Sequence, residues 1–236
     1  MNESPAATLK KLGFSSIKEL ETEQGILASS KTELYACIFG RDSLISALKL
    51  LRAYEKEGNG DYLALVRKIL INIATLQGTT TNIESGEQPG KIIHEYRPDH
   101  HERLTKRAAR SWYVYPEGDM RNYDSVDSTP LFLMAVARYL NLAPTDDAFK
   151  AGILSHAHAA LTWLFEYGDA NNDGFIDYQM HPDRTHGGLI VQSWMDSKES
   201  LFHEDGTAVV FPIAPVEVQA YTYAALRMWA SLLRET

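Results

Sequence analysis

The sequence is poor in cysteine and has no long apolar run. Its 236 residues include one cysteine, Cys37, which excludes an internal disulfide and a zinc cluster built on several cysteines. No run approaches the roughly 18 apolar residues that a membrane-spanning helix needs, and the N-terminus lacks the apolar core of a secretory signal. These absences predict a soluble, cytoplasmic protein with no membrane partner.

Positive charge is also scarce and scattered. The chain has 23 Lys and Arg residues against 31 Asp and Glu residues, for a net charge of −8. Because a nucleic-acid-binding surface needs a basic patch, nucleic acid is not an expected partner. The sequence lacks a G-x-S-x-G elbow, a P-loop and a dinucleotide-binding glycine pattern, and we expect no cofactor.

Helical periodicity dominates what is present. Apolar residues at helical spacing predict helices over residues 44–54, 61–77, 131–142, 149–165 and 215–233. Further helices are expected near the N-terminus, one after Ser4-Pro5 and one capped by Ser15 or Ser16. Residues 131–142 are apolar nearly all round, which indicates a buried helix. Alternating strand patterns are scarce, so the predicted fold class is all-α, with about seven or eight helices.

Polar motifs stand directly before three of these helices. FGRDS lies at 39–43, DSVDSTP at 124–130 and VVFPIAP at 209–215. Proline suits a first helical turn, where its missing N–H costs nothing. If alternate helices run in the same direction, these segments meet at one rim, as they do in a helical toroid with long loops at its mouth.

The long loops carry the aromatic, acidic and arginine side chains that a sugar site needs, because sugars stack on aromatic faces and their hydroxyls bind carboxylates and guanidinium groups. The candidates are Tyr35, Phe39, Arg41, Asp42, Glu95, Arg97, Trp112, Tyr123, Asp124, Asp127, Trp194 and Asp196. On spacing alone, helix capping by Arg41-Asp42 and by residues 124–128 is an equally good explanation.

Six motifs in order resemble a known family. YACIFGRDSLISALKLL, KIIHEYR, NYDSVDSTPLFL, DANNDGFIDY, VQSWMDSKES and FPIAPVEVQAYTYAAL are similar to motifs of amylo-alpha-1,6-glucosidases, the glucosidase part of glycogen-debranching enzymes. Glucosylglycerate and mannosylglycerate hydrolases are related. The resemblance implies an (α/α)6 toroid and an inverting glycoside hydrolase that cleaves alpha-linked glucosides of oligosaccharides or small molecules, without a cofactor.

The resemblance also implies residue roles. Asp196, in the segment Trp194-Met-Asp, matches the general acid, and to work near neutral pH it would have to be held protonated by burial near Trp194 or by a neighbouring carboxylate. Arg41 and Asp42 match residues that hold the hydroxyls of the cleaved sugar. The other matching pocket residues are Tyr35, Phe39, Glu95, Arg97, Tyr123, Asp124, Asp127 and Trp194. A purely structural ion pair is the alternative for Glu95 and Arg97.

The family's catalytic base has no match in the sequence. It is a Glu well beyond the acid, whereas this chain ends at Thr236, about 40 residues after Asp196. Twelve helices with such loops would need on the order of 400 residues. Glu217 and Glu235 remain, but Glu217 belongs to a motif without that role. The expectation is therefore one domain over residues 1–236, a partial toroid that lacks its C-terminal part, and whether this chain cleaves sugars alone stays open.

Three alternatives stay open. A non-catalytic carbohydrate-binding fragment would use the same pocket. A sugar epimerase on the same fold would need histidine as acid and base, for which the rim offers His94. Two copies could also associate through the open side of the toroid, which predicts an exposed apolar face with Trp229 and Leu232 on the last helix.

One segment resembles a calcium loop. Asp169, Asn171, Asp173 and Asp177 suit its ligand positions, but Met180 stands where a bidentate Glu is required. Asp and Asn also form tight turns between secondary-structure elements. The sequence therefore favours a turn and predicts no metal.

Overall fold

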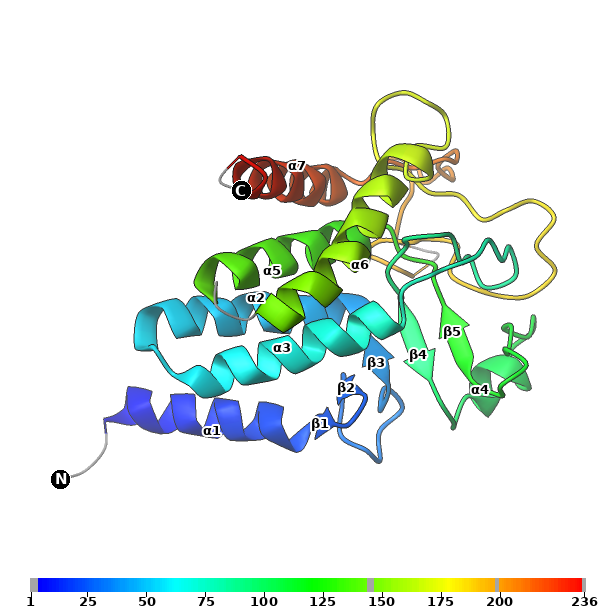
Figure 1. Cartoon of the computed structure of the whole chain (residues 1–236). Coiled ribbons are helices and arrows are strands. Elements are labelled where there is room, and N and C mark those ends of the chain that lie inside the picture. The colour runs from blue at the N-terminus through cyan, green and yellow to red at the C-terminus, as the bar shows by residue number, and fades with distance from the viewer. Residues whose placement is uncertain (1–3, 144–146, 198–199, 235–236) are drawn as a thin grey trace.

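The computed structural model describes residues 4–143, 147–197 and 200–234 and is rich in helix (Figure 1). Its helices are α1 (Pro5–Glu19), α2 (Gly40–Glu57), α3 (Gly60–Thr75), α4 (Glu102–Thr105), α5 (Ser128–Leu142), α6 (Asp147–Glu166) and α7 (Val216–Leu232). Its strands are β1 (Glu21–Thr22), β2 (Gly25–Ile26), β3 (Ile38–Phe39), β4 (Glu95–Arg97) and β5 (Met120–Asn122). Each of the five long helices predicted after residue 40 is present.

The helices form two layers. α5 contacts both α2 and α7, and these three run in the same direction, with their N-termini at the end of the molecule where β3, β4 and β5 lie (Figure 1). α3 and α6 run back and pack on α2 and α5. The prediction that the three polar motifs meet at one end is therefore confirmed. α1 and α7 lie on opposite sides of the stack, so the described helices form an open array, and the complete toroid stays a prediction.

Helix α5 is the centre of this array, as its all-round apolar sequence indicates. Phe132, Leu133 and Val136 are fully buried, and the helix contacts α2, α3, α6 and α7. Trp229 of α7 donates its indole N–H to the carbonyl oxygen of Leu133 at 3.0 Å and is 4% exposed. The expected exposure of Trp229 is therefore wrong, because this face of α7 packs on α5, and Leu232 is half-buried.

The prediction of a purely α-helical chain is wrong. β3, β4 and β5 form an antiparallel sheet in that order, with Phe39 opposite Glu95 and Glu95 opposite Asn122. β1 and β2 form a second antiparallel pair. Each strand has only two or three residues, which is too short for a period of two residues to be recognised in the sequence.

The N-terminal segment forms one helix instead of two. Ser4 caps α1 by accepting a hydrogen bond from the backbone N–H of Ala7 at 3.3 Å, and Pro5 occupies the first turn. Ser15 and Ser16 lie inside the helix and do not begin a new one. Within the part of the chain that the structure describes, no helix is both long enough and apolar enough to cross a membrane.

Candidate functional site

The start of α2 is fixed by a close backbone contact with β4. The N–H of Gly40 donates to the carbonyl oxygen of His94 at 2.9 Å. A Cβ atom on Gly40 would lie 2.0 Å from the carbonyl oxygen of Ile93, so only glycine fits here. The glycine of the FGRDS motif therefore has a structural reason, and it places Arg41 beside the small sheet.

Arg41 joins its own motif to two others that lie far away in the sequence. Its Nη1 atom lies 2.8 Å from Oδ2 of Asp127, and its Nη2 atom lies 3.3 Å from Oδ2 of Asp196. These partners are 86 and 155 residues away along the chain. Ser125 donates from its hydroxyl to the other oxygen of Asp127 at 2.5 Å. Three predicted site residues thus meet at the starts of α2 and α5.

Asp196 lies at the edge of this cluster. Its side chain is 40% exposed, while that of Arg41 is 14% exposed and that of Asp127 is fully buried. Asp196 is therefore partly buried, while Trp194 itself is 58% exposed. The ion pair with Arg41 is what positions Asp196.

A cavity of about 250 Å³ lies beside Asp196. Tyr35 and Phe39 approach each other in its wall, with ring centroids 6.1 Å apart. The predicted sugar-binding residues that line it are Tyr35, Phe39, Glu95, Arg97, Trp112 and Asp196. It is smaller than the roughly 300–1,000 Å³ of pockets for drug-sized ligands, and its aromatic rings and charged groups suit a small polar ligand such as a sugar ring.

Glu95 and Arg97 form a buried ion pair in the wall of this cavity. Arg97 also donates from Nη1 to the carbonyl oxygen of Leu34 at 3.0 Å, which ties the preceding loop to β4. Burial raises the pKa of Glu95, although the charge of Arg97 opposes this change. The pair therefore has the structural role that the sequence left open, and it also places a second carboxyl group in the cavity of Asp196.

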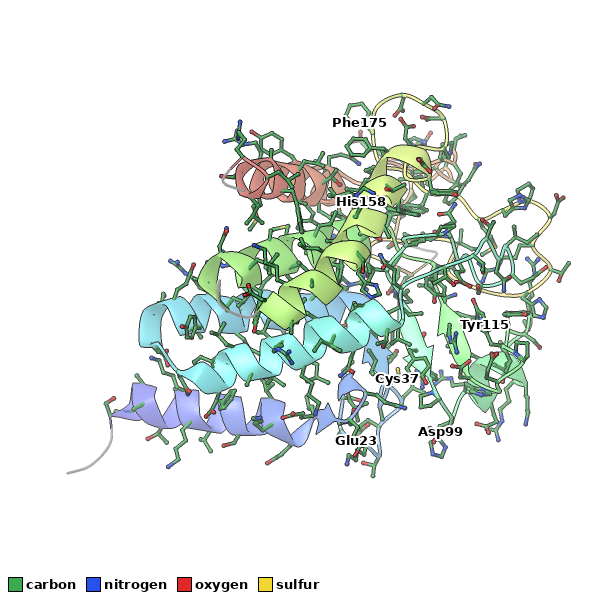
Figure 2. All side chains as sticks on the ribbon, in the orientation of Figure 1. Glu23, Cys37, Asp99, Tyr115, His158 and Phe175 are labelled. Atoms are coloured by element: carbon green, nitrogen blue, oxygen red, sulfur yellow. The ribbon has the colours of Figure 1, made fainter. Side chains whose placement is uncertain are left out.

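Cys37 lies at the base of β3, against this ion pair (Figure 2). It is 2% exposed, and its Sγ atom lies 3.6 Å from Oε1 of Glu95. Burial raises the pKa of the Cys37 thiol, and the charge of Glu95 adds to the effect. Since the thiolate is the nucleophilic form, Cys37 is an inert core residue.

His94 also lines the cavity and packs edge-on against Phe39, with ring centroids 5.4 Å apart. It is 3% exposed, and its Nδ1 atom is buried without a hydrogen-bond partner among the described residues. Burial, together with the charges of Arg41 and Lys91, lowers the pKa of His94 to about 3. The ring is therefore neutral at physiological pH and can bind a ligand by hydrogen bonding.

Two predicted site residues lie elsewhere in the core. Tyr123 is 2% exposed and donates its hydroxyl to the carbonyl oxygen of Leu76 at 3.0 Å. Asp124 is 1% exposed and forms an ion pair with Arg184 at 2.7 Å. The structure thus separates both from the cavity of Asp196, because the extended segment before α5 directs neighbouring side chains to different sides.

Asp42 and Trp194 also lie outside the cavity. Asp42 is exposed in the first turn of α2 and lines a different depression, together with Ile17 and Leu20 of the α1 segment. Consecutive residues in a helix point about 100° apart, so Asp42 cannot share the direction of Arg41. The ring of Trp194 lines none of the cavities described for residues 4–143, 147–197 and 200–234.

Glu217 belongs to a motif that predicts no catalytic role for it. It lies in the first turn of α7, and its Oε1 atom is buried without a hydrogen-bond partner in the described structure. Burial raises the pKa of Tyr221, the charges of Asp127 and Glu217 raise it further, and the charge of Arg41 opposes this change. In the sequence, only its position could have marked Glu217 as a site candidate, because it lies in the first turn of a helix that follows a polar motif. Glu235 lies outside the described residues.

The calcium-like segment is a self-capped turn beyond α6, with Phe175 at its exposed tip (Figure 2). Asp169 accepts from the backbone N–H groups of Asp173 and Gly174 at 3.1 and 2.8 Å. Asp177 accepts from Ala170 N at 3.0 Å. Among the described residues, no group of three or more His, Cys, Asp or Glu side chains is placed to hold a metal ion. The backbone hydrogen bonds to Asp169 and Asp177 are those of a tight turn, which is the structure that the sequence favours.

Comparison with known proteins gives no assignment. No protein-family model matches the chain, and no curated protein matches its sequence.

Proposed function

We propose that the chain is an inverting glycoside hydrolase of the amylo-alpha-1,6-glucosidase type, acting on alpha-linked glucosides. The observation that carries this proposal is the contact of Arg41 with Asp127 and Asp196, beside a cavity with aromatic walls. The resemblance of the six motifs to the family suggests the reaction. The geometry supports the proposal because residues from separate motifs meet at one site.

In this mechanism Asp196 is the general acid that protonates the glycosidic oxygen as it leaves. Its partial exposure lets it reach a ligand in the cavity, and Arg41 positions it. Phe39 and Tyr35 offer ring faces to the sugar, and Arg97 and neutral His94 offer hydrogen bonds to its hydroxyls. An inverting enzyme also needs a carboxylate base about 6.5–9.5 Å from the acid, to activate water on the opposite face. No residue of this sequence matches the family's base.

A binding-only role is the second candidate, and it is favoured because no residue of this sequence matches the family's catalytic base. The epimerase alternative is weaker, because a histidine whose pKa is lowered to about 3 does not exchange protons readily near neutral pH.

The test measures glucose release from isomaltose, a glycogen limit dextrin and glucosylglycerate, for the wild-type protein and for Asp196→Asn. Calorimetry with the same three sugars measures binding in parallel. We expect saturable binding, and we expect any turnover to fall by at least about 10²-fold in Asp196→Asn, since the acid's contribution is of order 10²–10⁴.

Binding without turnover would support the binding-only role. Turnover that is unchanged in Asp196→Asn would refute the assignment of the acid. If none of the three sugars bound or reacted, the whole proposal would fail.

A further inference from the structure

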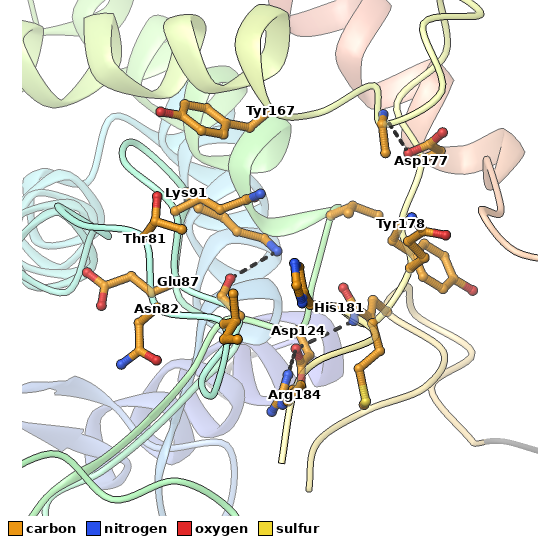
Figure 3. Close-up of a pocket in the computed structure, with 18 of the residues that line it drawn as sticks. Thr81, Asn82, Glu87, Lys91, Asp124, Tyr167, Asp177, Tyr178, His181 and Arg184 are labelled. Atoms are coloured by element: carbon orange, nitrogen blue, oxygen red, sulfur yellow. Dashed lines mark hydrogen bonds and ion pairs between the residues drawn. The ribbon is translucent and has the colours of Figure 1, made fainter. Parts of the chain in front are cut away.

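A second cavity of about 220 Å³ lies between the C-terminal end of α6 and two loops, residues 81–91 and 177–184 (Figure 3). It shares no lining residue with the cavity beside Asp196. Thr81, Gln179 and His181 in its wall are exposed, so solvent reaches it.

Lys91 lies in this cavity as a buried cation. It is 5% exposed, and its Nζ atom makes one long hydrogen bond, to the carbonyl oxygen of Gly86 at 3.4 Å (Figure 3). The same atom lies 5.6 Å from the ring centroid of Trp163. An ammonium group has three donors, and within the described residues no carboxylate lies within ion-pair distance of this one. A buried charge without a counter-ion is costly.

Two of the three carboxylates that line the cavity, Asp124 and Glu87, are bonded to other partners, and the third, Asp177, has its Oδ2 atom buried without a partner among the described residues. Asp124 pairs with Arg184 at 2.7 Å and also accepts from Asn122 Nδ2 and Leu189 N at 2.7 and 2.9 Å. Arg184 is itself bonded to the carbonyl oxygen of Gly187. The oxygens of Asp124 are therefore already bonded to groups other than Lys91.

Glu87 is equally occupied. Its Oε1 atom accepts from the backbone N–H of Thr79 at 2.9 Å, and its Oε2 atom accepts from the hydroxyl of Tyr115 at 2.7 Å. Lys91 therefore keeps donors without a protein acceptor, directed into a cavity that solvent can reach.

Two other donors in the wall suit a negatively charged ligand. The Nε atom of Arg184 is buried without a hydrogen-bond partner among the described residues. His181 accepts from Asp183 N at its Nδ1 atom, at 3.2 Å, which leaves its Nε2 atom to carry the proton.

We propose that this cavity binds a small organic anion whose carboxylate or phosphate group accepts hydrogen bonds from Nζ of Lys91. The anion would supply a counter-charge in direct contact with Lys91, whereas the charge of Asp124 raises the pKa of Lys91 without forming an ion pair with it. The cavity volume limits the ligand to a small metabolite. This site is separate from the proposed hydrolase site, so either proposal can fail without the other.

Calorimetry with the full chain would test the proposal, with inorganic phosphate, glucose 6-phosphate and succinate as anionic probes and glucose as the neutral control. The variants are Lys91→Met, which keeps an unbranched side chain and removes the charge, and Lys11→Met, which removes an exposed lysine of α1. We expect at least one anion to bind the wild-type protein and Lys11→Met, with binding weakened at least 10-fold in Lys91→Met. Removing an unpaired buried cation should leave the chain folded, which circular dichroism would check.

Burial lowers the pKa of Lys91 to about 8, so NMR of the lysine Nζ groups provides a second readout. A bound anion should raise this pKa towards the usual lysine value of 10.5. Binding of the phosphates alone or of succinate alone would identify the source of the anionic group. The proposal is overturned if no anion binds, if Lys91→Met binds as well as the wild type, or if glucose binds as tightly as the anions.

Discussion

Replacing Arg41 by methionine removes the cation from Asp127, whose side chain has no exposed surface. Breaking a buried ion pair on one side costs about 3–5 kcal/mol, because it leaves an uncompensated charge. Ser125 still donates to Asp127, so we expect the lower end, about 3 kcal/mol. For a chain of this size about 1 kcal/mol shifts Tm by about 2–4 °C, which gives a decrease of roughly 6–12 °C.

Urea unfolding at equilibrium measures this cost, and Arg52→Met is a matched control. Arg52 is 62% exposed and pairs with Glu55 at 3.1 Å on the surface of α2, so its loss should cost less than about 1 kcal/mol. The double variant Arg41→Met with Asp127→Asn should lose less than the sum of its single variants, by at least about 1 kcal/mol. Equal costs for Arg41→Met and Arg52→Met, or additive effects in the double variant, would refute the buried-pair argument.

Two further predictions concern the stability of the fold. Gly40→Ala should destabilise the chain by about 1–3 kcal/mol, because the new Cβ would lie 2.0 Å from the carbonyl oxygen of Ile93; a urea midpoint equal to that of the wild type would contradict this. Burial disfavours the charge of Glu84, but hydrogen bonds from His186 and Thr185 outweigh it and lower the pKa of Glu84 to about 2. This stabilisation is complete above the usual value of 4.5 and is lost as the pH falls towards 2. The stability difference between wild type and Glu84→Gln should therefore shrink between pH 5 and pH 2, and a constant difference would show that Glu84 does not titrate as described.

The long helices could be predicted because their apolar spacing persists over several turns. The burial of α5 could also be predicted, since Phe132, Val136 and their neighbours make the helix apolar nearly all round. The short strands could not be predicted in the same way. Phe39 and Glu95 are paired by the tertiary fold, and neither strand contains enough residues to show an alternation.

The site was predictable in part. Three separate motifs predict Arg41, Asp127 and Asp196 as site residues, and the structure brings them together. The same reasoning predicts Tyr123 and Asp124 as site residues, but they lie in other parts of the core. The sequence cannot separate these cases, because the direction of each side chain in an irregular segment depends on which loops pack around it.

Local spacing and composition are enough to predict that the chain is rich in helix, which helices are long, and that polar motifs precede three of them. The folded structure was needed to show that Asp196 pairs with Arg41 at a partly exposed edge, that His94 is buried and neutral, and that Lys91 lies in a cavity with no carboxylate within ion-pair distance among the described residues. The reason is physical: charge state and partner depend on burial and on contacts between segments far apart in the chain, and these exist only after folding.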